Sequence, residues 1–177
     1  MILQPADIIL DYNDRSSFTD IVAKWGLNSP YTHSSLYLGA SSQTNFVPAV
    51  LEALADGAHC RPISGKKGQR VAVIHVPWLT PMQRARVVVE ALALDGSHAY
   101  DYDDLLSVAI NCLLNRGLLK LHLPYRRDVR FICSECTAEP FWRAGIMILP
   151  MDREPLPPDF LKVGNPAFGF IGSTIEY

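Results

Sequence analysis

Cys133 is the residue of this sequence best placed to act as a nucleophile. It follows an apolar segment, Val129 to Ile132, that predicts a strand, and it precedes residues from Ser134 onward that favour a helix. A cysteine at a helix N-terminus lies at the positive end of the helix dipole, next to free backbone N–H groups. Both features favour the thiolate, which is the nucleophilic form. Backbone N–H groups near Ser134 could also stabilise an oxyanion, whereas the alternative interpretation is a buried structural cysteine.

Two further side chains could complete the chemistry of a thiol enzyme. His33 lies at the start of a predicted strand in PYTHSSLYLG and could act as a general base and then as an acid. Glu52 interrupts the apolar run VLEAL, and a carboxylate in such a strand is either exposed or buried with a partner. If the two strands pair, Glu52 could orient the imidazole. Tyr31 could donate its hydroxyl to an oxyanion, or it could be an ordinary packed aromatic residue.

The elements that must position these residues can be predicted from the apolar pattern. A turn at Asp56-Gly57 predicts a hairpin, and Thr80-Pro81-Met82-Gln83 predicts a capped helix start. Pro140 should kink the helix that begins near Cys133 or end its first segment, and the tail from Pro150 should form loops with one short helix. The predicted strands are Ala6 to Leu10, His33 to Leu38, Val50 to Leu54, His59 to Ile63, Val71 to Val76 and Val129 to Ile132; the other predicted helices are Ser17 to Trp25, Thr80 to about Leu94, and one from near Asp101. This order indicates an α+β fold with its strands clustered in the first half.

Several short motifs resemble the circularly permuted branch of the NlpC-type papain-like cysteine peptidase superfamily, the YiiX/YebB-like proteins. The segments that carry the resemblance are ADIILDYN, THSSLYLG, VLEALADGAHCRPI, AYDYDDLL and FICSECTAEPF, over roughly residues 5–146. The order of histidine before cysteine is the mark of the permuted branch. One departure is Ala6, where the family usually has glycine.

The resemblance implies a single papain-like domain over residues 1–177, with a small antiparallel sheet or barrel packed against helices. It implies Cys133 as nucleophile, His33 as base and Glu52 as the third polar member of a triad. It also implies peptide, cell-wall peptide or lipid acyl substrates, and no metal or organic cofactor.

Other functions are compatible with parts of the sequence. Cys133 and Cys136 form a CxxC that opens a predicted helix, as in thioredoxin-like redox proteins, but the expected βαβ pattern is missing upstream. The same pair could bind zinc with His59 and Cys60, although a single CxxC is a weak signal. A binding module that retains the fold without catalysis is the third alternative.

Composition limits the class of protein and of partner. The chain has 177 residues, of which 49% are hydrophobic and 19% charged, with a net charge of −2. This balance indicates one globular domain and gives no electrostatic case for nucleic-acid binding. We expect no transmembrane segment and no secretory signal, and therefore a cytoplasmic protein whose four cysteines are reduced.

Overall fold

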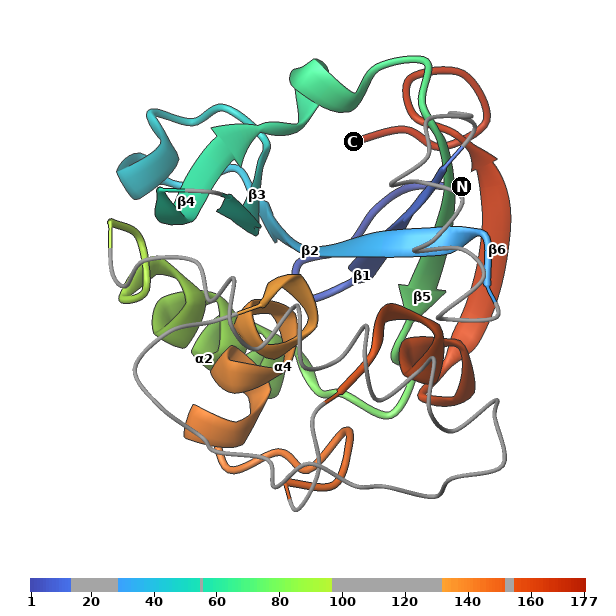
Figure 1. The fold of residues 1–177 in the computed structure, drawn as a ribbon. Helices are drawn as coiled ribbons and strands as arrows, with labels where there is room; N and C mark the ends of the chain where they lie inside the picture. Colours follow the sequence, from blue (N-terminus) through green and yellow to red (C-terminus); the bar gives the residue numbers. More distant parts are fainter. Residues whose placement is uncertain (14–28, 55, 97–131, 152–154) are drawn as a thin grey trace, which may run out of the picture.

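The structure, a computed structural model, describes residues 1–13, 29–54, 56–96, 132–151 and 155–177. Its centre is a six-stranded sheet in the order β4-β3-β2-β1-β5-β6, and every pair of neighbouring strands is antiparallel (Figure 1). The strands are β1 (Ile8–Tyr12), β2 (Tyr31–Gly39), β3 (Ala49–Leu54), β4 (Gly57–Pro62), β5 (Arg70–His75) and β6 (Asn165–Phe170). The prediction of an α+β fold with an antiparallel sheet is confirmed.

Most predicted strands agree with the structure to within two residues. The hairpin is confirmed, since β3 and β4 pair from Ala49 with Pro62 to Leu54 with Gly57. The first strand begins later than predicted, because Ala6 has a positive φ of 67° and lies in a turn. Glycine is favoured in this left-handed region, which gives a physical reason for the glycine that the resembled family carries here.

The tail departs from its prediction. It contains the expected short helix, η3 (Pro157–Lys162), but it also supplies β6, which pairs with β5 at one edge of the sheet. The prediction that the strands cluster in the first half was therefore wrong for β6. Its sequence, NPAFGF, contains a proline and a glycine that disfavour a central strand, and an edge strand tolerates both.

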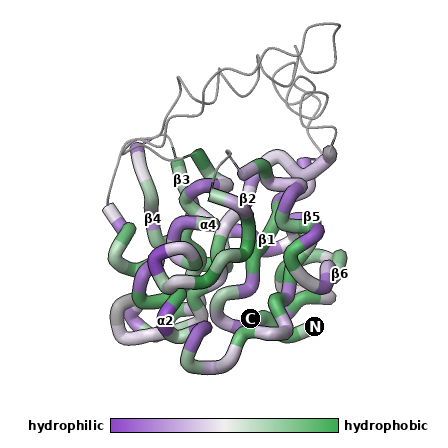
Figure 2. Tube along the Cα trace, turned by 90° about the horizontal axis from the view of Figure 1, so that it is seen from below, coloured by the Kyte–Doolittle hydropathy of each residue, from purple (hydrophilic) through white to green (hydrophobic). Residues whose placement is uncertain are grey.

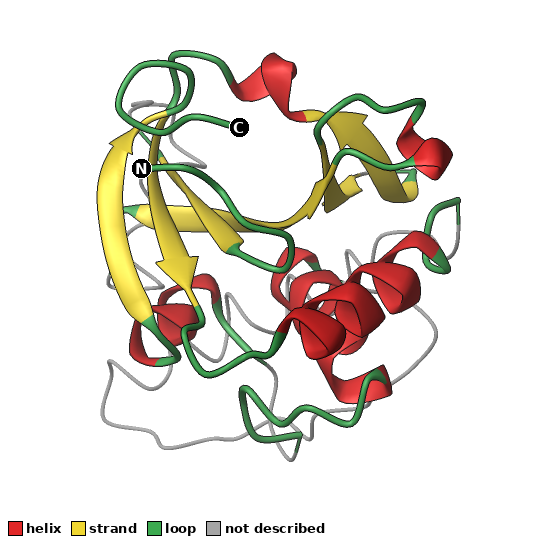
Figure 3. Ribbon diagram, turned by 180° about the vertical axis from the view of Figure 1, so that it is seen from behind, coloured by secondary structure: helices red, strands yellow, loops and turns green. Residues whose placement is uncertain are grey.

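Among the described residues, two α-helices pack against one side of the curved sheet (Figure 3). The helix α2 (Pro81–Leu92) begins as predicted, with Thr80 and Gln83 in a reciprocal capping box. The helix α4 (Cys133–Arg143) continues past Pro140, so of the two predicted effects of this proline, a kink or the end of a first segment, the second was wrong. Burial of nearly every side chain of α4 stabilises the helix enough to offset the one backbone hydrogen bond that proline removes.

The sheet separates two apolar clusters. The larger lies between the sheet and the helices and includes Leu36, Leu51 and Phe141, all fully buried. The smaller covers the opposite face and includes Ile9, Val50 and Ile63. Figure 2 shows apolar residues along the central strands β1 and β2, which contribute to both clusters.

Some predictions concern residues outside the described ranges. These are the helix over 17–25, the helix from near residue 101, and the strand over 129–132 except for its last residue. Within the described part of the chain, no helix has the length and apolar character needed to cross a lipid bilayer.

Candidate active site

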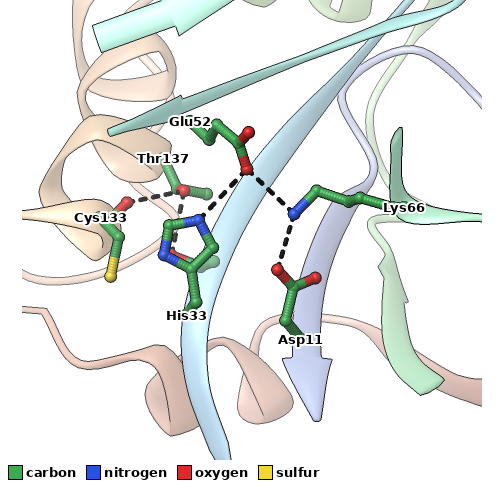
Figure 4. Close-up of polar contacts among 7 residues, drawn as sticks. Asp11, His33, Glu52, Lys66, Cys133 and Thr137 are labelled. Carbon is green, nitrogen blue, oxygen red and sulfur yellow. Dashed lines mark hydrogen bonds and ion pairs between the residues drawn. The ribbon is translucent and has the colours of Figure 1, made fainter. Parts of the chain in front are cut away.

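Cys133 is the first residue of α4, as the sequence predicted. The preceding residue, Ile132, is extended and caps the helix, and its N–H donates to Glu135 Oε2 at 3.2 Å. Cys133 is 6% exposed, and its side chain extends from the first turn of the helix toward β2 (Figure 4). The sequence feature that favours a thiolate, a cysteine among the free N–H groups of a helix start, is therefore present.

A buried hydroxyl pair fixes α4 against β2 beside this cysteine. Thr137 Oγ1 donates to the carbonyl oxygen of Cys133 at 2.9 Å and lies 3.1 Å from Ser34 Oγ. Ser34 directly follows His33 on β2, and Thr137 lies one helical turn after Cys133. The link holds the backbones that carry the cysteine and the histidine in a fixed relation.

The imidazole of His33 lies between a thiol and a carboxylate. His33 Nε2 is 3.4 Å from Glu52 Oε2, and the other ring nitrogen is on the side of Cys133 (Figure 4). Glu52 extends from β3, which pairs with β2, and it shares a face of its strand with Val50. The Glu52 side chain is 12% exposed. The sequence-predicted residues Cys133, His33 and Glu52 are thus brought together.

Electrostatics within this group favour an ion pair between thiolate and imidazolium. Burial alone would raise the pKa of the Cys133 thiol, but hydrogen bonding with His33 and the charge of that ring hold the pKa below that of a free thiol. Backbone N–H groups of Ser34 and Ser134 lower it further. Burial would lower the pKa of His33, but hydrogen bonds with Cys133 and Glu52 outweigh this and raise it well above 6.5.

Glu52 contacts His33 and also a lysine that sequence analysis did not select, and both favour its ionised form. Burial would raise the pKa of Glu52, but the hydrogen bond with His33 and the charge of Lys66 lower it to about 2. Lys66 Nζ lies 3.0 Å from Glu52 Oε2 and 2.6 Å from Asp11 Oδ2 (Figure 4). Lys66 and Asp11 therefore extend the site beyond the predicted three residues.

The comparisons with known proteins concern the fold. No protein-family model matches the chain, and no curated protein matches it. The crystal structure of the metalloprotein YiiX from Escherichia coli O157:H7, a DUF1105 protein, is similar, with a TM-score of 0.55 and 20% sequence identity over 82% of this chain and 68% of that chain.

This chain has a YiiX-like fold. The resemblance inferred from the motifs is confirmed at this level. Among the described residues, all paired neighbouring strands are antiparallel, so this part of the chain contains no βαβ unit of the kind that a thioredoxin-like interpretation requires.

Two predicted residues of the oxyanion site have other contacts in the YiiX-like fold. The Tyr31 ring is buried and packs edge-on against Tyr12 and stacked on Phe168, so the described contacts of the ring are those of a packed aromatic residue. Ser134 donates its hydroxyl to the carbonyl oxygen of Pro155 at 2.6 Å, which leaves its backbone N–H as the group directed at Cys133. An oxyanion role for either residue stays a prediction.

Asp11 and Lys66 carried weak signals in the sequence. Asp11 ends an apolar strand, where a charge is common because strands often end at the surface. Lys66 is followed by Lys67 in the segment Ser64 to Gln69, whose two glycines and polar residues are typical of a simple turn. Lys66 is buried and Lys67 is exposed, and nothing in the sequence distinguishes the two.

Metal ligation at this site conflicts with Lys66. Among the described residues, the side chains that could form a metal site of three or more ligands are those of Asp11, His33 and Glu52, whose ligand atoms lie within 4.8 Å of one another. The Lys66 ammonium contacts two of them, so a divalent cation there would lie beside a positive charge. The cluster suggested for zinc, with His59 and Cys60 joining the CxxC, does not form within the described ranges.

Proposed function

We propose that this protein is a thiol hydrolase or acyl-transfer enzyme in which Cys133 is the nucleophile. The observation that supports this most directly is the position of His33, whose ring has one nitrogen 3.4 Å from Glu52 Oε2 and the other on the side of Cys133. A nucleophile, a base within reach of it, and a third group that orients the base form the arrangement that nucleophilic catalysis requires.

In the first step the Cys133 thiolate attacks a carbonyl carbon, and the carbonyl π electrons move to oxygen. Backbone N–H groups at the start of α4, among them that of Ser134, which is directed at Cys133, would stabilise this oxyanion. The tetrahedral intermediate collapses, the leaving amine or alcohol takes the proton of the His33 imidazolium, and an acyl thioester remains on Cys133. His33 then removes a proton from water or from an acceptor amine, which attacks the thioester and releases the thiolate.

Glu52 acts on the imidazole in this mechanism. Its contact with Nε2 fixes the ring orientation and leaves the other nitrogen to exchange the proton with Cys133. Its negative charge stabilises the imidazolium that exists whenever Cys133 is ionised. The substrates we propose are amides or esters of peptides, cell-wall peptides or lipid acyl groups, as for the resembled family.

No step of this mechanism uses a metal. YiiX is called a metalloprotein, but the residues present here do not fit a divalent cation while Lys66 pairs with both carboxylates of the candidate group. The pKa of Lys66 is raised, because the negative charges of Asp11 and Glu52 outweigh the effect of burial, so the ammonium persists at neutral pH.

Capture of the acyl-enzyme tests the proposal without knowledge of the natural substrate. The protein is mixed with p-nitrophenyl acetate, and intact mass followed by peptide mapping locates the acetyl group. We expect a hydroxylamine-sensitive acetyl thioester on Cys133, absent from Cys133→Ala and strongly reduced in His33→Ala.

Cys136→Ser is the matched control, because Cys136 is buried in the same helix one turn away. It should be acylated at the wild-type rate. Loss of acylation in Cys136→Ser, together with a reversible Cys133–Cys136 disulfide in the wild type, would favour the redox alternative. Acetylation spread equally over the cysteines would contradict a dedicated nucleophile.

A further inference from the structure

Lys66 is a buried lysine, which is uncommon in proteins. It is the last residue of the short helix η2 (Ile63–Lys66), and its side chain is only 8% exposed. A buried ammonium is costly unless it is paired, and Lys66 is paired twice, with Asp11 and with Glu52. The mechanism proposed above uses neither Lys66 nor Asp11.

The backbone around Lys66 holds this geometry. Ile63 is fully buried in the smaller apolar cluster and donates its N–H to Pro48 at 2.9 Å. The N–H of Gln69 donates to the carbonyl oxygen of Lys66 at 2.9 Å, and that of Gly68 donates to Ile171 at 2.8 Å. The turn therefore directs Lys66 inward, while its neighbour Lys67 is exposed.

A single oxygen of the Glu52 carboxylate contacts both cationic side chains of the site, those of His33 and Lys66. Glu52 Oε2 lies 3.4 Å from His33 Nε2 and 3.0 Å from Lys66 Nζ. If Lys66 were neutral, Glu52 and Asp11 would be two unscreened carboxylates close together, and such a pair retains a proton. A protonated Glu52 could no longer stabilise an imidazolium at His33. The two carboxylates and the two cations, Lys66 and the imidazolium, balance in charge.

The other titratable groups around Glu52 do not replace Lys66. His59 lies opposite Glu52 in the β3–β4 ladder, but its Nε2 is 3.1 Å from Asp56 Oδ1. From α4, the nearby titratable groups are the thiols of Cys133 and Cys136, and the latter is buried with a pKa raised by burial and by neighbouring negative charges, Glu52 among them. The thiols carry no positive charge, and the imidazole of His59 pairs with Asp56 and not with Glu52.

We propose that Lys66 is a positioning residue of the proposed thiol enzyme: anchored by Asp11, its ammonium keeps Glu52 ionised and fixed against His33. The inference rests on the proposed function but concerns a separate link, from Lys66 through Glu52 to His33. The Lys66 ammonium then occupies the position at which a metal ion would otherwise be held by Asp11, His33 and Glu52.

The test is the rate of Cys133 alkylation by iodoacetamide as a function of pH, with peptide mapping to isolate Cys133. The acid limb of this profile is the rise in alkylation rate with pH as the ion pair forms. Lys66→Met should move it upward by about 1–3 pH units. Loss of an opposite charge raises a carboxyl pKa by about that much, and a protonated Glu52 no longer stabilises the imidazolium that pairs with the thiolate. Lys66→Arg should retain a limb near that of the wild type. Lys67→Met is the matched control, with the same loss of charge one residue away, and should leave the profile unchanged.

A double-mutant cycle separates positioning from a structural role. If Lys66 acts through Glu52, then Lys66→Met should have little further effect on the acid limb in a Glu52→Gln background. Equal shifts in both backgrounds would overturn the proposal. If Lys66→Met does not fold, Lys66→Gln removes the same charge, keeps a hydrogen-bond donor at this position and carries the same test. If either variant folds and keeps the acid limb of the wild-type profile, the proposal is also overturned.

The result for Lys66→Met can be told apart from a failure of the proposed hydrolase function. A wild type that alkylates at Cys133 but never forms an acyl thioester would contradict the hydrolase, and a shifted limb in Lys66→Met would still support the link to Glu52. Acylation with an unshifted limb would leave the hydrolase in place and remove Lys66 from it.

Discussion

The two cysteines of α4 have opposite chemical environments although they lie one turn apart. Cys133 is near an imidazole and backbone N–H groups that hold its pKa down. Cys136 is fully buried among apolar residues, and burial together with the negative charge of Cys133 raises its pKa. Cys60, on β4, also has its pKa raised by burial, to about 12. Of the described cysteines, only Cys133 is therefore expected to be a thiolate at neutral pH.

This difference predicts the pH dependence of alkylation. The pKa of Cys133 is lowered and that of His33 is raised, so the ion pair forms as pH rises through the former and is lost as pH rises through the latter. We expect Cys133 to react with iodoacetamide with an inflection well below the ordinary thiol value of about 8.5. His33→Ala should move that inflection upward. An inflection at or above about 8.5 in the wild type would contradict the ion pair.

Glu52 can be tested by a change that removes its charge and keeps its shape. Glu52→Gln retains an acceptor for His33 but no longer stabilises the imidazolium, so we expect acylation of Cys133 to slow by at least one order of magnitude. The upper bound is the roughly 10²–10⁴-fold contribution of a positioned acid–base group. The thermal unfolding temperature should show that the variant folds. A wild-type rate in Glu52→Gln, with His33→Ala inactive, would mean that a different residue orients the histidine.

At the scale of elements, the site could be predicted wherever local sequence decides geometry. The capping pattern at Thr80, the turn before Gly57 and the start of a helix at Cys133 are local signals, and all three agree with the structure. The pairing of the strands that carry His33 and Glu52 followed from the assumption that strands adjacent in sequence pair. These features bring the three predicted site residues together.

The features that could not be predicted depend on contacts between distant segments. Strand β6 forms because the tail returns to pair with β5, which the local sequence NPAFGF does not favour. The helix α4 continues past Pro140 because its surroundings bury it. Lys66 becomes part of the site only because η2 packs against β3, so that an ordinary loop lysine contacts Asp11 and Glu52.

At the scale of the whole molecule, a second buried charged cluster ties the helix α2 to the sheet. Asp7 is 1% exposed, and its Oδ1 lies 3.0 Å from His75 Nδ1 and 3.1 Å from Arg84 Nη1. Arg84, from α2, also donates to the carbonyl oxygens of Pro5 at 2.8 Å and Val76 at 2.7 Å. The cluster thus joins the segment before β1, the end of β5 and the first turns of α2.

This cluster lies away from the candidate active site. Asp11 pairs with His33 across the β1–β2 ladder, and Asp7 precedes Asp11 by four residues, which corresponds to about 13 Å along a strand. The acidic residue in the motif Ala6-Asp7-Ile8-Ile9, part of the resemblance to the YiiX/YebB-like proteins, therefore has contacts that stabilise the fold rather than contacts with the reacting groups.

Replacing Asp7 should consequently lower global stability without changing the chemistry of Cys133. Asp7→Ala leaves the Arg84 guanidinium buried without its carboxylate, and breaking a buried ion pair in this way costs about 3–5 kcal/mol. Urea unfolding at neutral pH measures this loss. Asp56→Ala is the control, because Asp56 pairs with His59 at 3.1 Å but its side chain is 72% exposed, and exposed pairs contribute about 1 kcal/mol or less. The alkylation rate of Cys133 in folded Asp7→Ala should match that of the wild type. Two results would show that Asp7 does not have the structural role argued from its contacts. One is a loss of stability no larger than that of Asp56→Ala, and the other is a lower alkylation rate of Cys133 in folded Asp7→Ala.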